Sequence, residues 1–148
     1  YVDVLNRVIE WKPEDLVVNM HICRGNFRST WFSSGGYEPV AKTLFGHCRV
    51  DGFFLEYDSD RAGDFTPLRY IKDQKVVLGL ITSKSGDLED KGEVIARIKE
   101  ASQYVPLEQL CLSPQCGFSS TEEGNILTIE AQWDKLKLID EIVHEVWG

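Results

Sequence analysis

The chain has 148 residues, of which 43% are hydrophobic and 27% are charged, a balance typical of one globular domain with a core of its own. Acidic residues outnumber basic ones by 24 to 16, a net charge of −8, which argues against nucleic acid or an anionic membrane as the main partner. The sequence has no apolar run near the roughly 20 residues of a membrane span and no signal-peptide pattern, and its four cysteines are too few for a disulfide-dense secreted scaffold, so we expect a cytoplasmic protein.

The apolar residues predict helices that alternate with short strands. The first ten residues carry one helical stripe, so the chain opens inside a helix, and we expect residues 1–148 to be the C-terminal portion of a longer chain. Strands are expected at residues 16–21, 52–57, 75–81 and 110–113. Helices are expected at residues 38–45, 66–71, 88–104 and 132–147, with Asp87 capping the third and Trp133 on the apolar stripe of the last.

This order predicts an α/β fold. Continuous apolar strands are typical of a parallel sheet covered on both faces, and the strand at residues 16–21 reads as buried. Repeated βα units form either a doubly wound sheet or a (β/α)8 TIM barrel. A barrel needs eight strands and about 250 residues. We therefore expect the C-terminal half of a TIM barrel, about four βα units with two open sheet edges.

Polar side chains close three of the predicted strands. His21 and Cys23 end the first strand, Glu56 ends the second and Cys116 follows the fourth. The carboxyl ends of parallel strands meet at one rim, where βα folds build their sites. Two thiolates, an imidazole and a carboxylate form a reasonable tetrahedral zinc set, and the thiolates favour zinc over magnesium or calcium. Because the ligands are scattered over several strand ends, the pattern resembles an active site more than a structural zinc knuckle.

Each of these residues also has a plainer interpretation. A single His-x-Cys pair is a weak signal, and a free cysteine such as Cys116 is often just part of a core. Glu56 is harder to dismiss, because an unpaired buried carboxylate is costly. The other candidates receive non-metal interpretations: His47 and Cys48 as a structural pair at the opposite rim, Cys111 as core, His144 as solvated, and Asp58 as either a substrate-binding residue or part of a solvated loop.

At these residues the chain resembles the C-terminal catalytic barrel of cobalamin-independent methionine synthase, and in particular its shorter, single-barrel relatives. The resemblance lies in three segments: residues 21–26 (HICRGN), residues 55–68 (LEYDSDRAGDFTPL) and residues 112–118 (LSPQCGF). It implies that His21, Cys23, Glu56 and Cys116 bind Zn²⁺. The longer spacing from Cys23 to Glu56 and the Tyr57-Asp58 pair after the glutamate depart from the large two-barrel enzymes.

The resemblance implies transfer of a methyl group from a 5-methyltetrahydrofolate-type donor to the thiol of homocysteine, which gives methionine. The expected partners are these small molecules, together with the missing N-terminal half of the barrel or a second copy of the chain. The alternatives are a zinc-dependent thiol alkyltransferase with another donor, such as a corrinoid carrier, or a fragment with a structural zinc site and no activity of its own.

Overall fold

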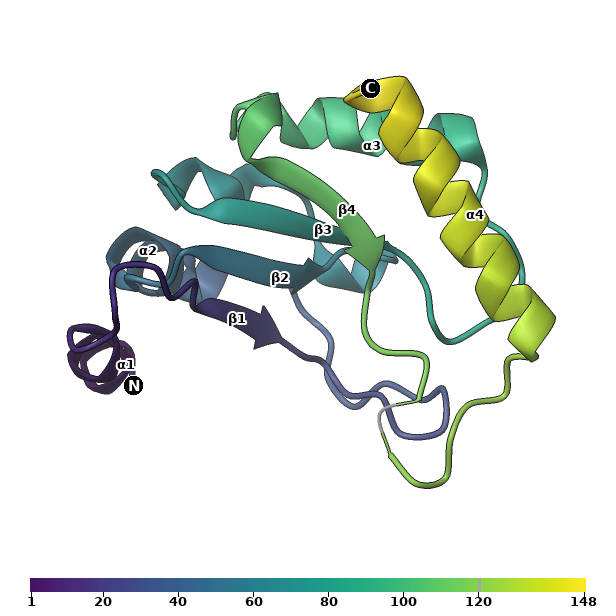
Figure 1. Ribbon diagram of the computed structural model, residues 1–148, viewed down its shortest axis with the longest axis horizontal. Coiled ribbons are helices and arrows are strands. Elements are labelled where there is room, and N and C mark those ends of the chain that lie inside the picture. The colour runs from purple at the N-terminus through teal and green to yellow at the C-terminus, as the bar shows by residue number, and fades with distance from the viewer. Residues whose placement is uncertain (120) are drawn as a thin grey trace.

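The computed structural model describes residues 1–119 and 121–148 as one parallel sheet with helices around it (Figure 1). Four α-helices are present in these residues: α1 (Val2–Ile9), α2 (Glu38–His47), α3 (Lys91–Ala101) and α4 (Ile129–Val146). The four strands are β1 (Asn19–Ile22), β2 (Gly52–Glu56), β3 (Lys75–Ile81) and β4 (Leu110–Pro114). Short 3₁₀ helices are formed by Asp60–Ala62, Thr66–Tyr70 and Leu107–Gln109. No helix in the described part of the chain combines the length and the apolar character needed to cross a bilayer.

The strands pair in the order β1-β2-β3-β4, all parallel. A doubly wound sheet reverses its strand order at a switch point, whereas an arc of a (β/α)8 barrel keeps the sequential order seen here. The predicted α/β class with a parallel sheet is therefore confirmed. The strands point the same way in Figure 1, so their carboxyl ends lie together, as do the loops that follow β1 and β4.

Several predicted boundaries are correct or nearly so, and three features differ. β3 matches its predicted range, but the segment at residues 66–71 forms only a short 3₁₀ helix, so one of the four βα units lacks an α-helix. Asp90, not Asp87, caps α3 by accepting a hydrogen bond from the Glu93 N–H at 2.8 Å. In α4 the predicted stripe faces the core at Ile139, Ile142 and Val146, but Trp133 is 57% exposed, while Lys135 is fully buried. Lys135 tolerates burial because its Nζ lies 3.0 Å from a Glu89 carboxylate oxygen.

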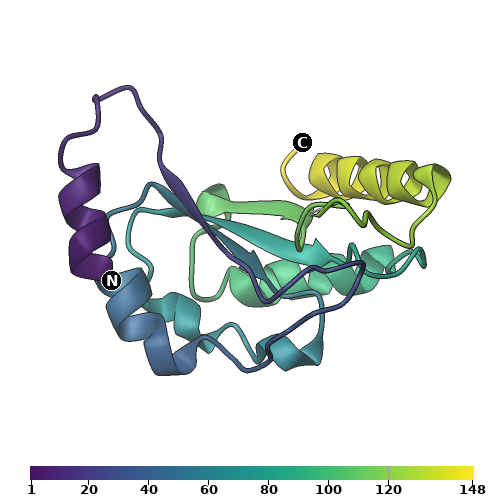
Figure 2. The ribbon, with the colours of Figure 1, turned by 90° about the horizontal axis from the view of Figure 1, so that it is seen from below.

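Among the described residues, helices cover only one face of the sheet. Helices α2 and α3 lie on the same side of the sheet in Figure 2. Phe53 and Leu55 of β2 are buried in one core together with Phe45 of α2 and Ile98 of α3. Phe54, which points the opposite way, is 37% exposed. The expectation of a sheet covered on both faces is thus wrong for the described residues. In a closed barrel the inner face of an arc packs against the opposite strands, which these four strands do not supply.

The edge strand β1 is also less buried than the sequence predicted. It begins at Asn19, three residues later than predicted, and alternates between exposed and half-buried residues instead of being buried. Leu16 and Val17, expected inside the strand, are 49% and 67% exposed. A strand buried on both faces and one at an open edge carry the same apolar residues, so the sequence pattern alone did not distinguish them.

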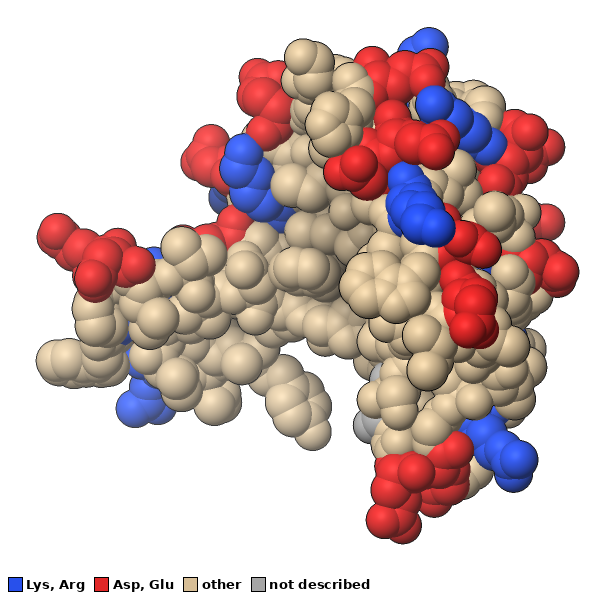
Figure 3. Space-filling view, turned by 45° about the vertical axis from the view of Figure 1, so that its right-hand side comes forward, with Lys and Arg blue, Asp and Glu red and all other residues tan. Residues whose placement is uncertain are grey.

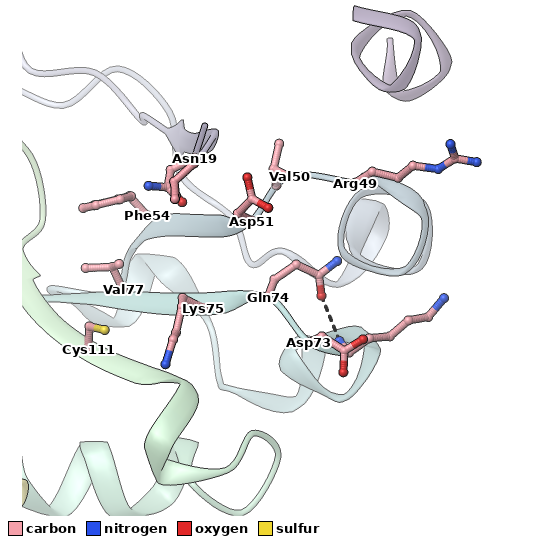
Figure 4. A pocket seen from close by; sticks show the side chains of 12 residues that line it. Asn19, Arg49, Val50, Asp51, Phe54, Asp73, Gln74, Lys75, Val77 and Cys111 are labelled. Atoms are coloured by element: carbon pink, nitrogen blue, oxygen red, sulfur yellow. Dashed lines mark hydrogen bonds between the residues drawn. The ribbon is translucent and has the colours of Figure 1, made fainter. Parts of the chain in front are cut away.

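The uncovered side contains a broad hollow of about 660 Å³ near the amino ends of the strands. Figure 4 shows that Asn19, Phe54, Val77 and Cys111, one from each strand, line it together with charged residues from the preceding loops. Figure 3 shows a deep indentation whose visible walls are mainly uncharged, whereas Asp and Glu side chains gather away from it.

Candidate metal centre

The four predicted ligands converge at the carboxyl end of the sheet. His21 lies in β1, Cys23 directly follows that strand, Glu56 is the last residue of β2, and Cys116 lies two residues beyond β4. One ligand atom from each residue lies within 4.8 Å of the others. Residues that are up to 95 positions apart in the chain thus surround one point in space.

The spacing of these atoms suits a tetrahedral zinc ion. The Sγ atoms of Cys23 and Cys116 are 4.0 Å apart. His21 Nε2 lies 3.7 Å from Cys116 Sγ and 3.7 Å from Glu56 Oε1. Bonds of 2.0–2.3 Å give a tetrahedron with edges of roughly 3.3–3.8 Å, so these three distances are close to those of a zinc-bound set, and all four ligand atoms lie within 4.8 Å of one another. The donor types, two sulfurs with one nitrogen and one carboxylate oxygen, also fit zinc.

The His21 imidazole is oriented for such a role by the main chain. Its Nδ1 lies 3.3 Å from the Phe54 carbonyl oxygen, which can only accept, so Nδ1 carries the proton in this contact. Nε2 then presents its lone pair to the other three side chains, the arrangement common for metal-binding histidines. The hydrogen bond to Cys116 is the main cause that raises the pKa of His21, with smaller contributions from the charges of Cys116 and Glu56.

Cys23 is placed by a tight turn after β1. Gly25 has a φ of +100°, and a Cβ atom there would lie 2.5 Å from the Phe32 nitrogen, so only glycine fits. The turn brings the Gly25 N–H to 3.3 Å from Cys23 Sγ. Partial burial raises the pKa of the Cys23 thiol, and the Gly25 hydrogen bond opposes that shift by favouring the thiolate.

Glu56 is fully buried and is held by groups that the sequence did not single out. The Arg24 N–H donates to Glu56 Oε1 at 3.1 Å. The Tyr37 hydroxyl accepts from the Glu56 N–H at 2.9 Å and lies 3.3 Å from the Glu56 carbonyl oxygen, to which it donates. Arg24 in turn stacks its guanidinium 4.4 Å from the centre of the Tyr37 ring. Neither Arg24 nor Tyr37 is one of the usual zinc-ligand types, so the search for zinc ligands in the sequence gave no signal for their role.

The loops after β1 and β4 are tied to each other beside the four ligands. Asn26 Nδ2 donates to the Gly117 carbonyl at 2.7 Å, and Ser29 Oγ donates to Asn125 Oδ1 at 2.7 Å. Arg28 and Ser29 have φ values of 42° and 64°, which non-glycine residues rarely adopt. These contacts hold Cys23 and Cys116, which lie on different loops, in one arrangement.

The other candidate residues lie elsewhere. Asp58 is ion-paired with Arg61 at 2.9 Å and lines a separate hollow with residues of α3. Cys48 is buried in the hydrophobic core, next to the exposed His47. Cys111, expected in the core, is half-buried on the uncovered face. His144 is exposed on α4, as expected.

A hollow of about 290 Å³ adjoins the metal group. Its lining includes His21 and Cys116, the apolar side chain of Phe54, and residues 113–117. Both His21 and Cys23 are exposed, so a small molecule can approach the ligands from this side. The arrangement can therefore hold a metal ion whose outer side is open to a substrate.

No family model matches the chain. Two Bacillus subtilis proteins described as uncharacterized, YxjH and YxjG, are 56% and 59% identical to it over 149 and 145 residues. These alignments span 99% and 97% of the chain but 40% and 38% of the relatives. A methionine synthase of Pyrococcus horikoshii is 23% identical over 78% of the chain and 30% of the relative. The chain thus spans about 40% of the length of these two Bacillus subtilis relatives.

Two solved structures share the fold. A Listeria monocytogenes protein, provisionally described as a vitamin-B12-independent methionine synthase, is 47% identical with a TM-score of 0.77 over all of this chain and 40% of that one. A B12-independent methionine synthase from a Shewanella species, solved with selenomethionine, has a TM-score of 0.75 at 22% identity, over 97% of this chain and 42% of that one. The four-stranded parallel sheet is therefore part of a larger fold in both proteins.

Proposed function

We propose that this chain carries the metal-binding part of a B12-independent methionine-synthase-type methyltransferase. Zn²⁺ would be bound by His21, Cys23, Glu56 and Cys116, and the acceptor would be the thiol of homocysteine. The observation that carries the proposal is the convergence of these four side chains, with atoms within 4.8 Å, at one rim of a barrel-like sheet. The similarity to proteins named methionine synthase supports the reaction class.

The charge of the ligand set favours thiol chemistry over water activation. Two thiolates and one carboxylate carry a total charge of −3, so a site that holds Zn²⁺ would have a net charge of −1. When bound, zinc would supply a positive charge that keeps a substrate thiol deprotonated at neutral pH. An electron-rich site of this kind polarises water poorly but leaves a thiolate nucleophilic.

The chain's own residues would hold and orient the reacting sulfur. His21 and Cys116 line both the ligand group and the adjoining hollow, so an acceptor seated there has its thiol beside them. Phe54 gives that hollow an apolar wall, which suits the methylene carbons of homocysteine and limits the access of water. The sulfur would then attack the methyl carbon in line, and the bond from that carbon to the donor nitrogen of a 5-methyltetrahydrofolate-type molecule would break.

We further propose that residues 1–148 form one partial TIM-barrel catalytic domain, the C-terminal portion of a longer chain. The uncovered inner face and the short span relative to the matched proteins support this. The groups that bind the donor would then lie outside this chain, and we expect the isolated chain to bind zinc but to form no methionine.

The test uses the full-length protein that contains this chain, purified with zinc. We expect one zinc per chain, and X-ray absorption at the zinc edge should show two sulfur ligands that become three when homocysteine is added. Methionine should form with 5-methyltetrahydrofolate as the donor, and parallel assays with a methylated corrinoid identify the donor class. Absence of stoichiometric zinc, or a sulfur count that does not respond to homocysteine, would refute the proposal.

A further inference from the structure

Gln115 is a buried polar residue next to the metal group that is neither one of its ligands nor exposed to solvent. It directly precedes Cys116 and is 2% exposed. Its side-chain amide lies between the carboxylate of Glu56 on one side and the polar groups of Ser83 and Lys84 on the other. Glu56 and Ser83 are themselves fully buried, so the amide makes these contacts away from bulk water.

The partners fix which way the amide points. A carboxylate can only accept and an ammonium can only donate, so the nitrogen must face Glu56 and the oxygen must face Lys84. In this orientation Gln115 Nε2 donates to Glu56 Oε1 at 3.1 Å and Oε2 at 3.2 Å. Gln115 Oε1 accepts from Ser83 Oγ at 2.7 Å and from Lys84 Nζ at 2.8 Å. The opposite orientation would place an oxygen against an oxygen.

The backbone is built to allow this approach. A Cβ atom on Gly79 of β3 would lie 2.7 Å from the Gln115 Cα and 2.7 Å from the Leu55 carbonyl oxygen, so any larger residue would push Gln115 away. The pairing of β3 with β4 shifts its register between Gly79 and Ile81, and the Gln115 N–H continues the ladder to the Ile81 carbonyl at 2.7 Å. The shift places Gln115 over Gly79, the residue that pairs with Glu56 in the neighbouring strand.

We infer that Gln115 is a positioning residue for the metal site: backed by Ser83 and Lys84, its amide holds the Glu56 carboxylate in the orientation of a ligand. The inference rests on the proposed function, because it takes Glu56 to bind the metal. A carboxylate offers roughly four lone-pair positions, and the bonds from Arg24 and Gln115 leave room for a metal ion.

Lys84 would act through Gln115 rather than on the metal. Its ammonium also lies 3.4 Å from Asn26 Oδ1, so it bonds to two amide oxygens from the loops after β1 and β4. A positive charge behind the amide strengthens the N–H that faces Glu56 and offsets part of the cost of burying that carboxylate. The β3–α3 loop would thereby contribute to a site whose ligands come from β1, β2 and the segment after β4.

The test measures zinc affinity in the full-length protein by competition with a chromophoric chelator. Gln115→Glu keeps the size of the side chain but replaces the donor with a carboxylate, which cannot donate when ionised and repels Glu56. We expect zinc to bind about 10–100-fold more weakly, the usual cost of losing a partner behind a metal ligand. The matched control is Gln103→Glu, the same change at an exposed residue, which should leave the affinity unchanged.

A second measurement separates positioning from folding. Cobalt(II) in place of zinc reports ligand geometry through its visible absorption bands, and these should shift in Gln115→Glu but not in Gln103→Glu. Lys84→Met should weaken zinc binding by about tenfold, at the lower end of the same range. In a Gln115→Leu background Lys84→Met should have no further effect, because Lys84 is expected to act through the amide.

The outcomes distinguish the inference from the proposed function. If the unaltered protein binds no zinc, the proposed function fails. If the unaltered protein binds zinc and both Gln115→Glu and Lys84→Met bind it equally well, with unchanged cobalt spectra, the proposed function stands and the role of Gln115 is wrong. An effect of Lys84→Met that persists in full in the Gln115→Leu background would overturn the role assigned to Lys84.

Discussion

Two histidine–cysteine pairs lie at opposite ends of the same sheet, and within residues 1–119 and 121–148 only one of them meets further candidate ligands. His21 and Cys23, at the carboxyl end of β1, lie with Glu56 and Cys116 within one ligand group. His47 is the last residue of α2, and Cys48 follows it before β2 begins, at the amino end, where Cys48 is 1% exposed within the core. The pairs look alike in the sequence, so the direction of the strands decides which one gains partners.

The two ends also use their polar side chains differently. At the amino end, Asn6 and Gln74 form hydrogen bonds to the main chain. Asn6 Nδ2 donates to the His47 carbonyl oxygen at 2.8 Å, and Gln74 Nε2 donates to the Cys48 carbonyl oxygen at 3.2 Å. At the carboxyl end Glu56 also accepts from the Arg24 N–H, but Glu56 and Gln115 contact other side chains as well. Polar side chains that satisfy backbone hydrogen-bonding groups stabilise a fold, whereas polar side chains that converge on one point in space can bind a ligand there.

The largest expected effect tests this contrast directly. Cys116→Ser removes a thiolate ligand and should weaken zinc binding by more than about 100-fold, beyond the cost of losing an outer partner. Cys48→Ser should retain one zinc per chain, because Cys48 lies at the other end of the sheet. Zinc analysis of the two purified variants measures the difference, and equal zinc contents would contradict the ligand assignment.

The same two variants should reverse their order when stability is measured without metal. Cys48→Ser places a hydroxyl in the hydrophobic core, which should lower the free energy of unfolding by about 1–3 kcal/mol. Cys116 is only half-buried, so its replacement by serine should change this free energy by less than about 0.5 kcal/mol. Urea unfolding of the metal-free proteins gives both values, and a larger loss in Cys116→Ser would show that the carboxyl end is also a folding element.

Tyr37 tests how firmly Glu56 is held. Tyr37→Phe leaves the buried Glu56 N–H without its acceptor, which should lower the free energy of unfolding by about 1–2 kcal/mol. Tyr104→Phe makes the same change at a tyrosine that is 37% exposed and should have little effect. Comparable unfolding midpoints for the two variants would mean that the Tyr37 hydroxyl contributes nothing to holding β2.

The sequence was sufficient to predict the parallel sheet and to nominate the group that the structure brings together. Both predictions depend on strand direction. Polar residues at the carboxyl ends of neighbouring parallel strands lie at the same rim of the sheet, so the sequence alone could place His21 near Glu56. That the group binds metal stays a prediction.

The contacts behind the ligands could not be predicted. Gln115 reaches Glu56 because the β3–β4 register shifts above Gly79, and Tyr37 reaches it from the start of α2. Such contacts depend on packing distances of a few ångströms, which apolar periodicity does not encode. The exposure of β1 was missed for a related reason, since burial depends on neighbours that lie outside the local pattern.

The smallest expected effect concerns Asp51, a charged residue at the amino end. The Val18 N–H donates to Asp51 Oδ2 at 2.7 Å, and Lys12 lies 3.1 Å from the same oxygen. The Val18 hydrogen bond, with help from Lys12, lowers the pKa of Asp51 below its ordinary value of 3.8. A carboxyl group with a lowered folded-state pKa stabilises the fold above its ordinary pKa, and that stabilisation is lost as the pH falls through the folded-state pKa.

Asp51→Asn should therefore remove one pH-dependent contribution without affecting the metal group. At pH 6 the variant should be less stable than the unaltered protein by no more than about 1 kcal/mol, because exposed ion pairs contribute little. The difference should shrink as the pH falls below about 3.8, because the unfolded chain then takes up a proton on Asp51 before the folded protein does. Urea unfolding at several pH values measures it, with Asp73→Asn as an exposed control. A difference that stays constant with pH would show that Asp51 acts through the shape of its hydrogen bond to Val18 and not through its charge.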